Sequence, residues 1–245
     1  MKKLIICILF LALFLVVKQN SFAVPVLQLY IEGSDYDASS ETWITNSPSF
    51  KLWVLGNVDG EGSHGSILGV NLVTAFATSE MGSGSTITLT PATTSLVTDP
   101  STPSTPGTPS YGVDVAPPFP SGSGEAPAHG IYGPGVSWNL YSIGDFTLTD
   151  SPVGDVITSF PPTWTQNKGQ INVYDVNITG YSLVHFDAYD HYVQGGKLKF
   201  VKAPFSHDAE SSGSPIPEPS TIFMMGSGLA GLLTLGSLRN KRKTS

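Results

Sequence analysis

The chain of 245 residues has a single cysteine, Cys7, and few charged residues, which make up 13% of its composition. Cys7 lies in the apolar run Leu4–Val17, which follows two lysines. A basic start, a short apolar run and a small-residue pattern ending at Ala23 predict a secretory signal peptide, residues 1–23. We expect export through the Sec machinery and cleavage by signal peptidase after Ala23. The exported protein would then have no thiol, which excludes a stabilising disulfide.

Arginine is absent between Val24 and Pro217, a segment with five Lys and 18 Asp and Glu and therefore a net charge of −13. A surface of this sign repels phosphate backbones and anionic lipid headgroups. The charge argues against nucleic acid as a partner and favours cations or neutral polymers.

Sustained helical periodicity is also absent from this body, which excludes a bundle of amphipathic helices. The whole chain has 26 Gly and 19 Pro, as is typical of a turn-rich β protein. Short runs rich in Val, Ile, Thr, Tyr and Phe predict an all-β fold, an antiparallel two-sheet sandwich of jelly-roll type. Within Gln170–Ile178 the alternating set of residues that would face inward changes midway, which predicts a β-bulge near Tyr174. The predicted strands are Val26–Ile31, Phe50–Leu55, Ile67–Ala77, Ser85–Thr90, Val136–Tyr141, Asp145–Leu148, Val153–Phe160, Gln170–Ile178, Leu183–Tyr189 and Lys197–Val201.

One region departs from the strand pattern. Pro91–Gly130 contains nine prolines and is otherwise rich in Ser, Thr, Gly and Ala. Such a composition predicts a long loop across one sandwich, and a linker between two small domains is the alternative. Trp53 and Trp138 lie inside predicted strands and are expected in the core. Trp164 lies in a proline-containing turn and is expected to be exposed.

The end of the chain has three parts in a fixed order: the motif Pro217-Glu218-Pro219-Ser220, the apolar stretch 222–238 and a basic cluster. A helix over that stretch would span about 25 Å, close to the short limit for a hydrocarbon core of about 30 Å. The arrangement resembles the PEP-CTERM sorting signal of Gram-negative bacteria. The resemblance implies that residues 214–245 enter the inner membrane transiently and are processed by an exosortase. The product would reside in the cell envelope, on the surface or outside the cell. A plain C-terminal membrane anchor is the alternative.

The body of the chain resembles the choice-of-anchor N group of exported proteins. The similar segments include HGIYGPG, GQINVYDV, HFDAYDHY and APFSHDAE, and the similarity runs from Val24 to Glu210. The resemblance implies one exported unit, residues 24–213, and implies no activity.

The densest polar cluster lies on a predicted strand near its end. His185 and Asp187 share one face of such a strand, because side chains alternate. Two imidazoles and several carboxylates could hold a divalent metal, and a strand-end hydrogen-bond network is the alternative. The candidate residues are His185, Asp187, Asp190 and His191, with His207, Asp208 and Glu210 as further ligands.

Two acidic turns are candidate calcium sites. Asn57, Asp59 and Glu61 occupy loop positions 1, 3 and 5 with Gly at position 6, but position 12 lacks the Glu of an EF-hand. Asp35 and Asp37 form a similar acidic turn after the first predicted strand. Calcium, the one cofactor considered, would act structurally by joining strand ends, and ordinary Asn/Asp/Gly turns are the alternative.

These features together predict a non-enzymatic surface or extracellular-matrix protein with a structural or adhesive role. Exopolysaccharide of the envelope or of a biofilm is a candidate partner. A serine nucleophile elbow of the form G-x-S-x-G is absent from the sequence. The alternative function is a secreted polysaccharide-modifying enzyme displayed by the same tail.

Overall fold

The computed structural model describes residues 26–60, 63, 65–94, 105–115, 132–158, 164, 167–194, 196–202 and 208–212. The described residues form thirteen strands and one short 3-10 helix: β1 (Leu27–Ile31), β2 (Asp35–Asp37), β3 (Thr42–Thr45), β4 (Ser49–Asp59), β5 (Ile67–Ala77), η1 (Thr78–Glu80), β6 (Thr86–Ala92), β7 (Ser110–Val113), β8 (Val136–Phe146), β9 (Ser151–Val153), β10 (Asn167–Thr179), β11 (Leu183–Gln194), β12 (Lys197–Lys202) and β13 (Asp208–Ser212). In this part of the chain no helix has the length and hydropathy needed to cross a membrane. The predicted signal peptide, 1–23, and the predicted span, 222–238, lie outside the described residues.

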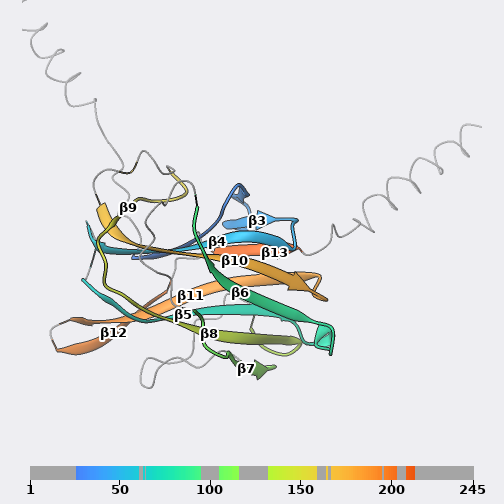
Figure 1. Cartoon of the computed structure of the whole chain (residues 1–245). Helices are drawn as coiled ribbons and strands as arrows, with labels where there is room; N and C mark the ends of the chain where they lie inside the picture. The colour runs from blue at the N-terminus through green and yellow to red at the C-terminus, as the bar shows by residue number, and fades with distance from the viewer. Residues whose placement is uncertain are drawn as a thin grey trace, which may run out of the picture.

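The strands form two sheets that pack as layers (Figure 1). The smaller sheet has the order β1-β4-β10-β6, with β9 beside β10. The larger sheet has the order β2-β3-β13-β11-β5-β8-β7, with β12 beside β11. Neighbouring strands are antiparallel except β13 and β3, which run parallel. The predicted all-β sandwich is confirmed, with one parallel pair in an otherwise antiparallel arrangement.

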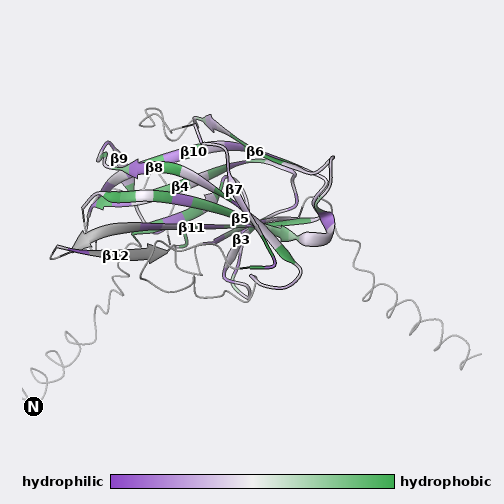
Figure 2. Cartoon of the chain, turned by 90° about the horizontal axis from the view of Figure 1, so that it is seen from below, coloured by the Kyte–Doolittle hydropathy of each residue, from purple (hydrophilic) through white to green (hydrophobic). Residues whose placement is uncertain are grey.

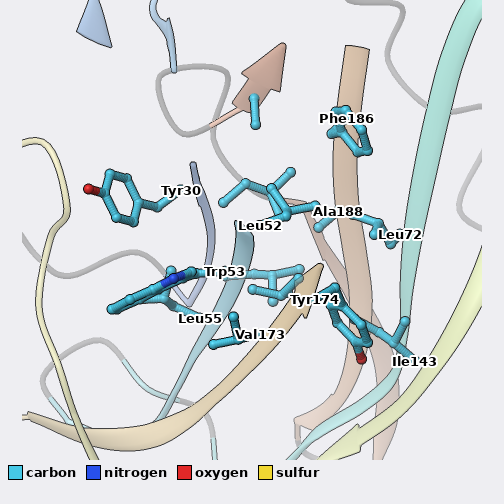
Figure 3. Packing of buried hydrophobic residues seen from close by; sticks show 14 of the residues in the cluster. Tyr30, Leu52, Trp53, Leu55, Leu72, Ile143, Val173, Tyr174, Phe186 and Ala188 are labelled. Carbon is cyan, nitrogen blue, oxygen red and sulfur yellow. The ribbon is translucent and has the colours of Figure 1, made fainter. Parts of the chain in front are cut away.

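The core lies between the facing sides of the two sheets. Figure 3 shows Leu52 of the smaller sheet beside Ala188 of β11, and Tyr174 of the smaller sheet beside Ile143 of β8. The rings of Phe50 and Phe186 meet edge to face across the layers, with centroids 5.7 Å apart. Green hydrophobic stretches run along β4 and β5 in Figure 2. Each large apolar side chain buried in this way stabilises the fold by about 1.5–3 kcal/mol, and these contacts hold a body that has no cysteine.

Burial was predicted correctly for Trp53 and Trp138, whereas the predicted exposure of Trp164 is wrong. Trp53 and Trp138 are buried as expected, but Trp164 is only 6% exposed. A Cβ on Gly154 would lie 2.1 Å from Cδ1 of Trp164, so the indole packs directly on the glycine backbone. The missing side chain of Gly154 therefore lets Trp164 reach the core.

Several predicted strand bounds also need correction. Val136–Tyr141 and Asp145–Leu148 were expected as separate strands but belong to the single strand β8, which runs to Phe146. Gly144, with φ of 87°, lies opposite Val70 at a register irregularity and lets the strand continue. The predicted strand Val153–Phe160 is wrong because β9 ends at its first residue.

The predicted bulge near Tyr174 is wrong as well. At that residue β10 stays in register with both β4 and β6, and the irregularity lies between Lys168 and Gln170. A Cβ on Gly169 would lie 1.9 Å from the carbonyl oxygen of Gly56. The glycine at the bulge therefore allows a close approach of β10 to β4.

The predicted loop Pro91–Gly130 is partly strand. β6 continues through Pro91 to Ala92, and Ser110–Val113 forms β7 against β8. β6 lies at the edge of its sheet, where a proline removes no essential ladder hydrogen bond. Three further strands, β2, β3 and β13, were not predicted because each has only three to five residues, and β2 and β13 are also largely polar.

Gly56 of the smaller sheet lies against side chains of the larger sheet and generates a packing prediction. A Cβ at this position would lie 2.5 Å from Cδ2 of Phe146 and 2.9 Å from Cδ1 of Ile67. We expect Gly56→Ala to destabilise the fold by about 1–3 kcal/mol, because the layers must separate. Urea unfolding of the full-length chain measures this change. Gly82→Ala is the control, since a Cβ there meets nothing within 4 Å. Equal losses of stability in the two variants would contradict the close approach.

Candidate functional site

Two neighbouring strands of the larger sheet, β11 and β13, place polar side chains together on one face. In their antiparallel register His185 lies opposite Glu210. Side chains alternate along a strand, so His185 and Asp187 point away from the core into which Phe186 packs. The same register brings Asp208 beside Asp187. His185, Asp187, Asp208 and Glu210 are referred to below as the histidine–carboxylate cluster.

The imidazole of His185 stands among three carboxylates. Its Nε2 lies 3.6 Å from Oδ1 of Asp187 and 3.7 Å from Oδ2 of Asp208. Its Nδ1 lies 3.5 Å from Oε2 of Glu210. One ligand atom from each of His185, Asp187 and Asp208 falls in a group whose members all lie within 4.8 Å of one another. Both ring nitrogens therefore face negative charge.

The histidine–carboxylate cluster is buried although it lies on the outer face of the sheet. His185 and Asp187 are each 8% exposed, and Asp208 is 2% exposed. The hydroxyl of Tyr132 covers the site and donates a hydrogen bond to Oδ2 of Asp187. Val73 of β5 lies opposite Asp187 and joins a small second hydrophobic cluster. That second cluster consists of Val73, Trp138 and Tyr189, with Tyr132 and Leu140 packed against it.

The electrostatics of the site follow from this burial. Burial by itself lowers the pKa of His185, but the interactions with Asp187, Asp208 and Glu210 outweigh it and hold the pKa well above its usual value. Burial, followed by the charge of Asp187, raises the pKa of Tyr132. The hydroxyl of Tyr132 consequently stays protonated and remains a donor. The site attracts positive charge at His185 Nε2, either as a proton or as a metal ion.

Asp190, the candidate residue on β11 that follows Asp187, takes no part in this grouping. Asp190 is fully buried but does not belong to the set of ligand atoms described above. The side chains of His191 and His207 lie outside the described part of the structure. The sequence prediction therefore holds for His185 and Asp187 as neighbours, together with Asp208 and Glu210.

The first predicted calcium site begins in a strand and not in a turn. Asn57 and Asp59 lie within β4, which extends to Asp59, because residues 52–56 pair with both β1 and β10 and Asp59 pairs with Lys168 of β10. Asn57 is fully buried, Asp59 is exposed, and Glu61 lies outside the described residues. Calcium binding by these three residues stays a prediction.

The second acidic turn has its own internal hydrogen bonds. Asp35 is exposed in β2. The carboxylate of Asp37 accepts hydrogen bonds from the backbone N–H and hydroxyl of Ser39 and from the hydroxyl of Ser40. These bonds, that from the Ser39 backbone foremost, lower the pKa of Asp37. Their geometry is that of an ordinary Asx turn, and calcium binding there also stays a prediction.

Tyr132 is the member of the site that sequence reasoning missed. It lies 55 residues before Asp187 in the chain. No spacing rule links a tyrosine in the segment HGIYGPG to a carboxylate on a distant strand. Only the three-dimensional arrangement reveals the contact.

The tail of the chain matches a known sorting signal. Residues 215–242 match the PEP-CTERM protein-sorting motif, which includes Pro217, Glu218, Pro219 and Ser220. Such a motif implies export, processing by an exosortase and a location on the cell surface or outside the cell. No curated protein matches the chain. The similarity of the body to the choice-of-anchor N group stays a prediction.

Tyr132→Phe tests the polar contact that covers the site. The variant removes the hydroxyl that donates to Asp187 and leaves a buried carboxylate with one donor fewer. We expect a loss of about 1–3 kcal/mol in the free energy of unfolding, measured by urea titration. Tyr111→Phe is the matched control, because Tyr111 is 72% exposed, and it should change stability by less than about 0.5 kcal/mol. An unchanged stability of Tyr132→Phe would show that the contact contributes nothing.

Proposed function

We propose that the protein is an exosortase-processed component of the cell envelope or extracellular matrix, in which the β-sandwich has a structural or adhesive role. The observation that carries the proposal is that the sorting motif follows β13 closely in the sequence. β13 ends at Ser212, and the matched segment begins at residue 215. The processed tail is therefore connected to the sandwich through β13.

The position of β13 supports a role in which the body is held at its carboxyl end. Its backbone pairs with β11 on one side and with β3 on the other. The side chain of Ser211 also donates a hydrogen bond to the carbonyl oxygen of Ser47. Tension applied through the tail would act on a strand that is bonded along both edges.

The burial of the histidine–carboxylate cluster argues against the alternative of a displayed enzyme. A reaction on a polysaccharide needs catalytic groups that the chain of sugars can reach. His185 and Asp187 are each 8% exposed beneath Tyr132. Burial of this degree favours a structural role for the most concentrated group of titratable side chains found among the described residues.

A surface on β7 supports adhesion to neutral exopolysaccharide. Tyr111 is 72% exposed, and Val113 and Val115 are 40% and 53% exposed. β7 is an edge strand of the larger sheet. A sugar ring can stack on an exposed tyrosine ring through apolar contact, whereas the acidic body repels anionic polymers.

Processing of the tail is tested by its mass. We expect the envelope-bound protein to be lighter in cells with an exosortase than in cells without one, because the tail is cleaved. Replacing Pro217, Glu218 and Pro219 by alanine should give the unprocessed mass in both strains. Alanine replacement of Pro117, Pro118 and Pro120, outside the matched segment, is the control and should leave processing intact. An unprocessed tail of the unaltered protein in both strains would contradict the proposal.

Adhesion is tested on an array of neutral polysaccharides with the full-length chain in detergent. We expect Tyr111→Ala to weaken binding by at least about fivefold, because the exposed ring is lost. Leu148→Ala removes another exposed apolar side chain, 42% exposed, from a different part of the surface and should leave binding unchanged. Absence of binding by the unaltered chain would contradict the adhesive role while leaving tail processing untouched.

A further inference from the structure

We propose that the histidine–carboxylate cluster is a divalent transition-metal site, with zinc as the ion that fits its ligands. The ligand atoms are Nε2 of His185, Oδ1 of Asp187 and Oδ2 of Asp208. The metal joins β11 to β13. This inference goes beyond the proposed function and does not depend on it.

The spacing of the ligand atoms carries the proposal. An N–H···O hydrogen bond has a donor–acceptor distance of about 2.7–3.2 Å. Nε2 of His185 lies 3.6 and 3.7 Å from its two carboxylate oxygens, beyond that range. Zinc–ligand bonds of about 2.0–2.2 Å in a tetrahedron place neighbouring ligand atoms roughly 3.3–3.6 Å apart. The separations of 3.6 and 3.7 Å from Nε2 of His185 are therefore close to those between neighbouring zinc ligands, and all three ligand atoms lie within 4.8 Å of one another.

The groups around these three ligands complete the pattern. A metal-bound imidazole usually donates its other N–H to a carboxylate, which orients the ring. Oε2 of Glu210 lies 3.5 Å from Nδ1 of His185, also beyond hydrogen-bond range, and is the carboxylate on that side of the ring. A ligating carboxylate is usually hydrogen-bonded at its other oxygen, and Tyr132 donates to Oδ2 of Asp187 while Oδ1 faces His185. With Glu210 beside Nδ1 and Tyr132 on Oδ2, the atoms of His185 and Asp187 that face each other are Nε2 and Oδ1.

Charge and ligand type select the class of ion. Three carboxylates and one imidazole in a buried site carry an excess of negative charge, which a divalent ion neutralises better than a single proton does. Imidazole nitrogen suits zinc and other transition metals, whereas calcium and magnesium prefer shells of oxygen. The body from Val24 to Pro217 has no cysteine, so a thiolate site is excluded there.

The location gives the site a structural consequence. β11 pairs with β13 over Leu183–Phe186 and with β12 over Tyr189–Gln194. Asp187 lies between these two pairings, where the neighbour on that edge changes. A metal held by Asp187 and Asp208 would attach β13 to β11 at the first residue of β13.

Zinc binding by the full-length chain, purified in detergent and stripped with a chelator, tests the proposal. We expect one zinc per chain in a competition titration. Zinc at 100 times its dissociation constant should raise Tm by roughly 5–10 °C. Calcium or magnesium at the same concentration should give no comparable shift. Less than stoichiometric zinc, or an equal effect of calcium, would overturn the proposal.

Variants locate the site. Asp208→Asn should lower zinc affinity by more than about 100-fold, and Glu210→Gln, which alters only the partner of Nδ1, by about 10–100-fold. Glu210 is 28% exposed on its side chain, so Glu210→Gln should retain the fold, as circular dichroism would verify. Asp35→Asn is the control, because Asp35 is exposed and belongs to the other predicted acidic site. Unaltered affinity in Glu210→Gln with its fold intact, or a loss of affinity in Asp35→Asn, would place any bound zinc elsewhere and overturn the assignment.

Discussion

The larger sheet depends on the insertion of β13 between β3 and β11. β3 pairs only with β2 and β13 among the described strands, so without β13 the β2–β3 pair would lose its connection to the rest of the sheet. β13 is also the last described strand and precedes the matched sorting segment. The sandwich is consequently completed by residues close to its carboxyl end, next to the segment that directs the protein to the cell surface.

The alternation of side chains along β11 links the core to the polar cluster. Phe186 packs against Phe50 of the opposite sheet, while His185 and Asp187 on either side of it face outward. The outward face is covered by Tyr132 and its hydrophobic neighbours, so residues 184–190 of β11 are buried on both sides. One strand therefore supports the hydrophobic core on one face and a charged cluster on the other. In a protein that lacks disulfides, both contribute to holding the terminal strand.

Much of the fold could be predicted from periodicity, and the failures have physical causes. Ile67–Ala77 was predicted with its observed bounds because its β-branched and apolar residues form a continuous run. β13, with the sequence DAESS, has no apolar pattern, and its pairing on both edges is visible only in three dimensions. His185 and Asp187 could be grouped by strand alternation, whereas Tyr132 reaches them through a contact between distant segments. Trp164 was misassigned because the proline-rich sequence before it gives no sign that its indole packs on Gly154.

Hydrogen exchange of the full-length chain, followed by mass spectrometry, tests the central place of β13 most directly. A strand paired along both edges should open only when the whole sheet unfolds. Amides of residues 208–212 are therefore predicted to exchange as slowly as those of residues 183–186 in β11. Rapid exchange of 208–212, with β11 and β5 still protected, would show that β13 is a detachable edge and would contradict the account.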